Sequence, residues 1–340
     1  MMNRMLSQCA LGLVNSWAGS SFLSSIESRD RRDNVLRVIT YHRVDVPSEN
    51  PHLYPGVHSA TPDQFAAQLD QLDRCSHIVS LDEVLSALEG GHRLPAKSVL
   101  ITFDDAYQNF ETAWQHLKSR GLPVVLFVPT SFPDHPERTF WWDRVHWAIQ
   151  STSQTTISLD GDTLSLEGRK QKSQAARWVA AKVKQLPHRE AMPWIDVLCQ
   201  DLQEDARPNE VLSWQRLREL SEEGVTIGAH THTHPLMNQI TLDEARDEAT
   251  RSREELEQRL GKKVRSFCYP AGGVSDEVAA MLREIGYTAA FTTQRGVNDL
   301  SNCDAMRLNR INVGGRTSTN VMRMQFLTYA RNLKPEQQPV

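Results

Sequence analysis

The chain has 340 residues, of which 39% are hydrophobic and 24% charged, and its formal net charge is −4. This composition is ordinary for a globular protein, and the weakly acidic charge gives no basic footprint for nucleic acid, so we expect no nucleic-acid partner. The length fits two average domains or one large α/β barrel. A disulfide framework and a cysteine-ligated zinc site are not expected, because no CxxC pair occurs among Cys9, Cys75, Cys199, Cys268 and Cys303.

Residues 1–33 are interpreted as a lead-in segment. The apolar stretch at 10–14 is short and flanked by polar residues, which makes a poor signal-peptide core. No window approaches the ~20 apolar residues that a membrane-spanning helix needs. We therefore expect a short amphipathic helix that packs on the domain or touches a membrane surface through residues 1–25. A cytoplasmic protein, with or without membrane association, is favoured over an exported one.

Apolar runs of strand-forming residues alternate with amphipathic helical patterns as far as residue 128. Thr61-Pro62 is an N-cap followed by proline at the first helical position, and Ser80 with Glu83 forms a capping box. The alternation predicts strands at 34–41, 78–80, 98–103 and 123–128, and helices starting at 62, after 80 and at 107. Strands that alternate with helices in this way indicate a parallel sheet or barrel.

The alternation stops at residue 133 and resumes after residue 211. We interpret 133–211 as a mixed insertion packed on one side of a single barrel domain that spans 34–332, with a tail at 333–340. Asp160-Gly161-Asp162 predicts a hairpin turn within the insertion. Beyond it the sequence predicts helices at 213–223, 241–260, 275–285 and 317–332, and strands at 225–229, 264–269, 287–292 and 308–313.

Four predicted strands end on polar residues of unusual type. These are His42 after the first strand, the pair Asp104-Asp105, the histidine-rich stretch 230–234, and the turn-forming stretch 269–273. The active sites of barrel enzymes are assembled at the C-terminal ends of their strands. Convergence of carboxylates and imidazoles there indicates a catalytic site more strongly than any one motif.

The two adjacent carboxylates repel each other unless a cation or a shared proton relieves them. In an extended chain His230, His232 and His234 share one face, whereas in a helical turn His230 and His234 meet as an i, i+4 pair. Two imidazoles and one carboxylate form a common open site for Zn²⁺ or a similar divalent ion. The second carboxylate can then act as a general base, and a histidine can protonate the leaving group.

Thr102-Phe103-Asp104-Asp105, followed by His230-Thr231-His232-Thr233-His234, resembles the first two motifs of the polysaccharide deacetylases, carbohydrate esterase family four. The resemblance covers most of residues 34–315 and implies a distorted (β/α)7 barrel with a divalent metal, Zn²⁺ being our first choice. It implies that Asp104 is the general base and that the metal is bound by Asp105, His230 and His234.

The third motif of that family, Arg-Pro-Pro-Tyr-Gly, corresponds here to Cys268-Tyr269-Pro270-Ala271-Gly272. The arginine that steadies the base is replaced by Cys268. Ala271 stands where the family has a tyrosine whose backbone N–H forms part of the oxyanion hole, and we assign Tyr269 and Ala271 to the oxyanion and substrate side. Arg310, on the last strand, is our substitute for the arginine; the alternative is an ordinary arginine at the sheet edge.

The family's last motif, Leu-x-His, which supplies the acid, is absent near the C-terminus. Tyr41-His42 on the first strand resembles a subset of the family in which the acid comes from the N-terminal part of the barrel. We therefore assign the acid to His42, because the first and last strands of a closed barrel are neighbours. The alternative is that His42 is a buried polar residue without a catalytic role.

Trp141 and Trp142, in the insertion, have two interpretations. They either pack in a core or form a wall on which a sugar ring stacks. The leading functional hypothesis is a metal-dependent hydrolase that removes N-acetyl or similar acyl groups from a carbohydrate, in the biosynthesis or modification of a polysaccharide or glycoconjugate. Two alternatives stay open: a barrel amidohydrolase acting on a small cyclic amide, imide or formamide, and a non-catalytic carbohydrate-binding relative.

Overall fold

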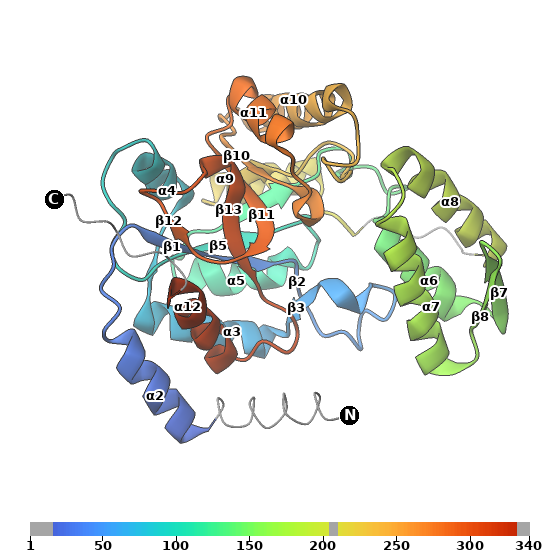
Figure 1. Ribbon diagram of the computed structural model, residues 1–340, viewed down its shortest axis with the longest axis horizontal. Coiled ribbons are helices and arrows are strands. Elements are labelled where there is room, and N and C mark those ends of the chain that lie inside the picture. The colour runs from blue at the N-terminus through green and yellow to red at the C-terminus, as the bar shows by residue number, and fades with distance from the viewer. Residues whose placement is uncertain (1–15, 204–209, 332–340) are drawn as a thin grey trace.

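Seven parallel strands from along the whole chain close into a barrel (Figure 1). The computed structural model describes residues 16–203 and 210–331. The barrel strands are β1 (Val35–Tyr41), β5 (Ser98–Phe103), β6 (Val125–Val128), β9 (Thr226–Ala229), β10 (Ser266–Cys268), β11 (Ala289–Arg295) and β13 (Leu308–Asn312). Their order is β1-β13-β11-β10-β9-β6-β5, and pairing of β1 with β5 closes the ring. The predicted (β/α)7 barrel is confirmed.

Burial explains why the barrel strands are mainly apolar in sequence. Every residue of β1 and β5 is buried, as expected for parallel strands that are covered on both faces. Side chains alternate between the two faces, so Leu36 and Val38 join one apolar cluster while Ile39 and Tyr41 join another. Two short strands extend the sheet: β4 (His77–Ile78) pairs with β5, and β12 (Asn298–Asp299) pairs antiparallel with β1.

Helices surround the barrel, and two of them begin at the predicted caps Thr61 and Ser80. The capping boxes at Thr61, Ser80 and Thr241 each form both of their reciprocal hydrogen bonds. These helices are α3 (Pro62–Cys75), α4 (Leu81–Leu88), α5 (Phe110–Ser119), α9 (Trp214–Glu222), α10 (Leu242–Leu260), α11 (Asp276–Ile285) and α12 (Thr319–Arg331). The prediction that a helix starts at residue 107 was wrong. Asp105 and Ala106 have positive φ, so the chain turns before α5 begins at Phe110.

The predicted insertion extends to one side of the barrel in Figure 1 and has an apolar cluster of its own. Asp160 and Gly161 both have positive φ and connect a two-stranded hairpin, as their sequence predicted. The elements of this lobe are α6 (Trp141–Ser151), β7 (Thr156–Leu159), β8 (Asp162–Ser165), α7 (Gly168–Val183) and α8 (His188–Asp201).

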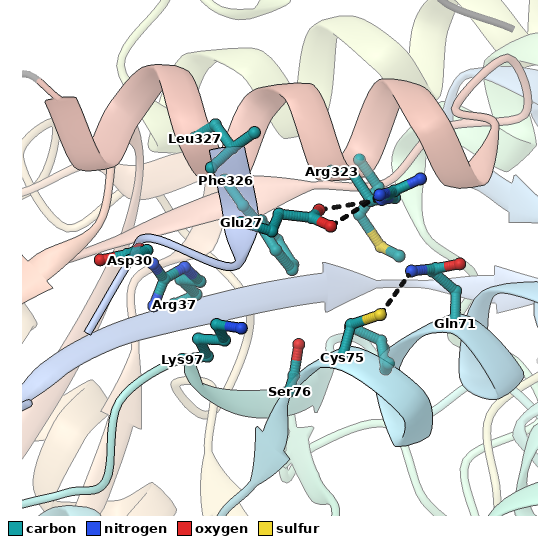
Figure 2. Close-up of a pocket in the computed structure, with 12 residues that line it drawn as sticks. Glu27, Asp30, Arg37, Gln71, Cys75, Ser76, Lys97, Arg323, Phe326 and Leu327 are labelled. Carbon is teal, nitrogen blue, oxygen red and sulfur yellow. Dashed lines mark hydrogen bonds and ion pairs between the residues drawn. The ribbon is translucent and has the colours of Figure 1, made fainter. Parts of the chain in front are cut away.

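The lead-in helix α2 (Trp17–Glu27) lies against α12 (Figures 1 and 2). Arg323 of α12 is only 4% exposed, and its guanidinium donates to the Glu27 carboxylate at 2.8 and 2.6 Å and to the Ser24 hydroxyl at 2.7 Å. No helix among the described residues is long and apolar enough to cross a membrane. Residues 1–15, most of the segment predicted to contact a membrane, lie outside the described residues, so that contact stays a prediction.

We expect Arg323→Met to lower the free energy of unfolding by about 1–3 kcal/mol, because it leaves the half-buried Glu27 carboxylate without its hydrogen-bonding counterion. Urea denaturation followed by circular dichroism measures this change. Arg331→Met, at the exposed end of the same helix, is the matched control and should change the stability little. Equal stability of the two variants would mean that α2 does not depend on Arg323.

Candidate active site

Polar side chains from four barrel strands or the residues that follow them converge at one end of the barrel. Asp104 and Asp105 follow β5, His230 follows β9, Arg310 lies on β13, and His42 follows β1. A cavity opens over this end, and both the barrel and the insertion contribute to its wall. The lining includes His42, Tyr54, Val57, Asp104, Asp105, Trp141, Trp142, Ala180, Lys184, His230, His234, Leu236, Pro270, Ala271 and Thr293.

Three side-chain atoms in this cavity form a nearly equilateral triangle. Asp105 Oδ1 lies 3.3 Å from His230 Nε2 and 3.3 Å from His234 Nε2, and the two nitrogens are 3.2 Å apart. Ligands ~2.0 to 2.1 Å from a tetrahedral ion are separated from one another by roughly 3.3 Å. The donor set and its spacing therefore fit one divalent ion, with one tetrahedral position left open for water or substrate.

Backbone contacts orient these ligands. His230 Nδ1 is 2.7 Å from the backbone oxygen of Cys268, which directs Nε2 toward Asp105. Burial alone would raise the pKa of Asp105, but its hydrogen bonds with the two histidines outweigh burial and hold the pKa well below the ordinary value. Asp105 is therefore an anion at neutral pH, as a metal ligand must be.

The histidine stretch adopts a turn and not an extended strand. Thr231 and His234 have positive φ, and this turn brings His230 and His234 together while His232 points elsewhere. His232 Nδ1 lies 2.9 Å from the Thr130 hydroxyl and is absent from the ligand triangle. The sequence had left both geometries open, and the i, i+4 pair is the one observed.

Glu248 of α10 holds this turn from outside the cavity. Its Oε2 accepts the backbone N–H groups of His232 and Thr233 at 2.8 and 2.7 Å, and its Oε1 accepts the Thr233 hydroxyl at 2.6 Å. A carboxylate is well suited to satisfy several unpaired donors in a tight turn. Sequence reasoning missed Glu248, because in the sequence it is one of many acids on a charged helix.

Asp104 is held by Arg310 of β13, and β1 lies between β13 and β5 in the barrel. Arg310 Nη1 and Nη2 donate to Asp104 Oδ1 and Oδ2 at 2.8 and 2.7 Å, and both residues are nearly fully buried. Burial by itself would raise the pKa of Asp104, but the Arg310 charge and hydrogen bonds hold the pKa below its usual range. Cys268 Sγ lies 3.5 Å from the same carboxylate. Asp104 is therefore paired with a guanidinium, that of Arg310, although residue 268 is not arginine.

His42 lies beside Asp104 and is partly open to the cavity. Its Nε2 is 4.0 Å from Asp104 Oδ2, and its side chain is 23% exposed. The backbone N–H of His42 donates to the Ser59 hydroxyl at 2.9 Å. Ser59 belongs to β3 (His58–Ala60), which pairs with β2 (Arg43–Val44). The pairing brings β3 against the end of β1.

Several non-glycine residues around the cavity have left-handed backbone conformations. Asp105, Ala106, Thr231, His234 and Ala271 are non-glycine residues with φ between 48° and 72°. Each such residue costs on the order of 1 kcal/mol or more and persists only where its surroundings enforce it. Such residues gather at active sites and ligand clamps, and here they lie in the segments that follow β5, β9 and β10.

Some of the residues predicted to contact the substrate line the cavity, and Tyr269 does not. Trp141, Trp142 and Ala271 line the cavity, and the Trp142 ring meets His234 at 5.2 Å between centroids. Tyr269 does not line it: the side chain is buried, and its hydroxyl donates to the Met306 carbonyl at 3.0 Å, so the expected substrate role of this side chain finds no support.

Three further residues of the wall had no sequence signal: Tyr54, Lys184 and Thr293. Tyr54 comes from the proline-rich loop after β2, Lys184 follows α7 of the insertion, and Thr293 belongs to β11. None belongs to a motif, because long-range folding alone brings these segments to the cavity.

Several solved structures have the same fold as this chain. The Streptococcus pyogenes deacetylase PplD in complex with acetate aligns with a TM-score of 0.57 and 20% identity, over 86% of this chain and 98% of that one. IcaB from Ammonifex degensii has a TM-score of 0.57 and 20% identity, over 87% and 97%. The de-N-acetylase from Aggregatibacter actinomycetemcomitans has 0.57 and 16%, over 86% and 100%. A comparison with curated proteins gave no match.

A family model confirms the relationship that the motifs suggested. The model described as polysaccharide deacetylase matches residues 91–290, which is more than half of the chain and includes both the aspartate pair and the histidine turn. The motifs in this range agree with the family model, and the three solved structures share the barrel fold. This chain belongs to the polysaccharide deacetylase family.

Proposed function

We propose that this protein is a metal-dependent hydrolase that removes N-acetyl or similar acyl groups from a carbohydrate, in the biosynthesis or modification of a polysaccharide or glycoconjugate. The observation that carries the proposal is the triangle of Asp105, His230 and His234 donor atoms beside an Asp104 carboxylate that is free of that triangle. A binding protein has no need of both features, whereas hydrolysis uses ligands and a base together.

Asp105, His230 and His234 would hold the ion, and Zn²⁺ is favoured because two imidazoles and one carboxylate match its ligand preference. When bound, the ion supplies Lewis acidity for an acyl carbonyl and lowers the pKa of a coordinated water.

Asp104 takes the proton from the attacking water in this proposal. Its depressed pKa keeps it ionised, and the two hydrogen bonds from Arg310 fix the plane of its carboxylate. Proper orientation of a base contributes to catalysis as much as its pKa does.

His42 gives a proton to the leaving amine or alcohol, and the Ala271 backbone faces the carbonyl oxygen. His42 is suited to this role because it lies next to Asp104 and remains open to the cavity. Ala271 has a φ of 48°, which bends the chain at the cavity wall, and a backbone N–H there can serve as an oxyanion donor whatever its side chain. Trp141 and Trp142 provide apolar surface for a sugar ring.

Removal of metal from the full-length protein should abolish acetate release. We expect dialysis against a chelator to lower the turnover of N-acetylglucosamine oligomers on the order of 100-fold or more, and stoichiometric Zn²⁺ to restore it. Mg²⁺ is the control, because this ion prefers oxygen ligands and should not restore activity. Full turnover by protein shown to be metal-free by elemental analysis would contradict the proposal.

A further inference from the structure

Tyr54 is held at both backbone polar groups by buried charged side chains. Its N–H donates to Asp143 Oδ1 at 2.6 Å, and its carbonyl accepts from Arg43 Nη2 at 2.9 Å. Asp143 and Arg43 are 3% and 1% exposed. Tyr54 itself lies in a surface loop, where backbone groups normally bond to water. Hydrogen bonds from two buried ionic groups to the backbone of one loop residue hold that residue in place.

Asp143 connects this loop to two other parts of the cavity wall. Its Oδ2 accepts the Tyr107 hydroxyl at 2.6 Å, and that hydroxyl oxygen accepts the Trp142 indole N–H at 2.8 Å. One carboxylate therefore links the loop of Tyr54, the turn after the Asp104-Asp105 pair, and helix α6 of the insertion. Burial raises the pKa of Asp143 to about 6 in spite of these hydrogen bonds.

The Tyr54 ring lies back over Gly56. A Cβ atom at residue 56 would lie 2.2 Å from Cε1 of the ring, so a side chain there would force the ring to move. Tyr54 also lines the cavity that contains Asp104 and Asp105, together with Trp142. The loop is therefore built to present one aromatic ring at a fixed place in the catalytic cavity.

We propose that Tyr54 contacts the substrate as an aromatic platform for a sugar ring, and that Asp143 and Arg43 are positioning residues that fix this platform relative to Trp142. The inference rests on the proposed function and deepens it, because it adds a saccharide contact from the barrel side to the tryptophan wall from the insertion. Aromatic faces suit the apolar face of a pyranose, and a ring that is already fixed loses little entropy when a sugar binds.

The test compares Tyr54→Ala and Tyr54→Phe in the zinc-loaded, full-length protein on two substrates. N-Acetylglucosamine oligomers need the platform, whereas p-nitrophenyl acetate carries no sugar and reports the reacting centre alone. We expect Tyr54→Ala to raise KM for the oligomer about ten-fold, with kcat and ester turnover nearly unchanged. Tyr54→Phe keeps the ring and should stay close to wild type. Tyr329→Ala, on α12 away from the cavity, is the control.

Asp143→Asn tests the positioning role. An amide offers one oxygen to two donors, so either Tyr54 or Tyr107 loses its acceptor. We expect a rise in the oligomer KM smaller than that of Tyr54→Ala, again with ester turnover retained. Asp196→Asn, an exposed carboxylate of the same lobe, is the matched control. If Asp143→Asn does not fold, the Tyr54 variants still decide the proposal.

An unchanged oligomer KM in Tyr54→Ala overturns the inference, as does an equal loss of ester and oligomer turnover, which would mean a merely structural role. Wild-type protein that releases no acetate from any glycan contradicts the proposed function instead. In that case titration with the oligomer, followed by tryptophan fluorescence, decides the platform separately. Weaker binding by Tyr54→Ala supports it, and equal binding, or no binding by wild type, overturns it.

Discussion

Arg310→Met should lower kcat for acetate release on the order of 100-fold while the metal content stays near that of wild type. The guanidinium donates two hydrogen bonds that orient Asp104, and a base that is misplaced by about 1 Å loses about this much. The variant also leaves a buried carboxylate without its counterion, which should cost about 3–5 kcal/mol of stability. Steady-state kinetics, elemental analysis and thermal unfolding measure the three effects.

The same variant should change the pH dependence in a defined direction. The Arg310 charge holds the pKa of Asp104 below its ordinary value of 3.8, so the ion pair stabilises the wild-type fold at neutral pH. That stabilisation is lost as the pH falls from 3.8 through the lower native pKa. In Arg310→Met the pKa of Asp104 rises, and the acidic limb of the pH–rate profile should move to higher pH. A profile with an unmoved acidic limb would contradict this coupling.

A double variant can distinguish the effect of losing the guanidinium from general damage to the fold. Cys268 occupies the position at which the related motif has arginine, and its Sγ already lies 3.5 Å from Asp104. Cys268→Arg combined with Arg310→Met should recover part of the lost kcat, because the new side chain can use the space that Arg310 vacates. Arg307→Met, three residues earlier in the chain and paired with Asp276 and Asp304, is the control and should keep its activity.

The barrel and its ligand triangle could be predicted because their signals are local. Ser98–Phe103 is a mainly apolar run followed by two carboxylates, and parallel strands present their C-terminal ends on the same side. The strand ends alone therefore predicted that Asp105 and the histidine turn lie close together, without knowledge of any contact between them. Arg310 could be proposed only after Cys268 was seen in place of an arginine, since nothing around Asn309-Arg310 marks a catalytic arginine.

The supporting residues could not be predicted, because their partners are far away in sequence. Asp143 meets Tyr54 across 89 residues and Tyr107 across 36, and in the sequence it stands among tryptophans as an ordinary helical acid. The start of α5 was also misplaced. The predicted helix began at Tyr107, but Asp105 and Ala106 adopt left-handed conformations in the turn that follows β5, and the helix begins only after that turn.

Asp104→Asn and Asp105→Asn should separate the base from the metal site, although the two residues are neighbours. Asp104→Asn keeps Asp105, His230 and His234, so it should bind one divalent ion per chain while kcat falls on the order of 10²- to 10⁴-fold through loss of the base. Asp105→Asn replaces a charged ligand, so its metal affinity should fall and its activity should recover in part when excess Zn²⁺ is added. Calorimetric titration with Zn²⁺ and acetate release distinguish the two outcomes.

The contrast between these neighbours depends on where each carboxylate points. Asp104 is directed at Arg310 and its oxygens are absent from the Asp105–His230–His234 triangle, whereas Asp105 Oδ1 lies 3.3 Å from both imidazole nitrogens. Asp196→Asn, exposed on α8, is the control for any effect of a carboxylate-to-amide change on the whole chain. Undiminished turnover in Asp104→Asn would mean that Asp104 is not the general base. Loss of the ion in the same variant would mean that Asp104 and not Asp105 completes the metal site, and the base would then have to be sought at His42.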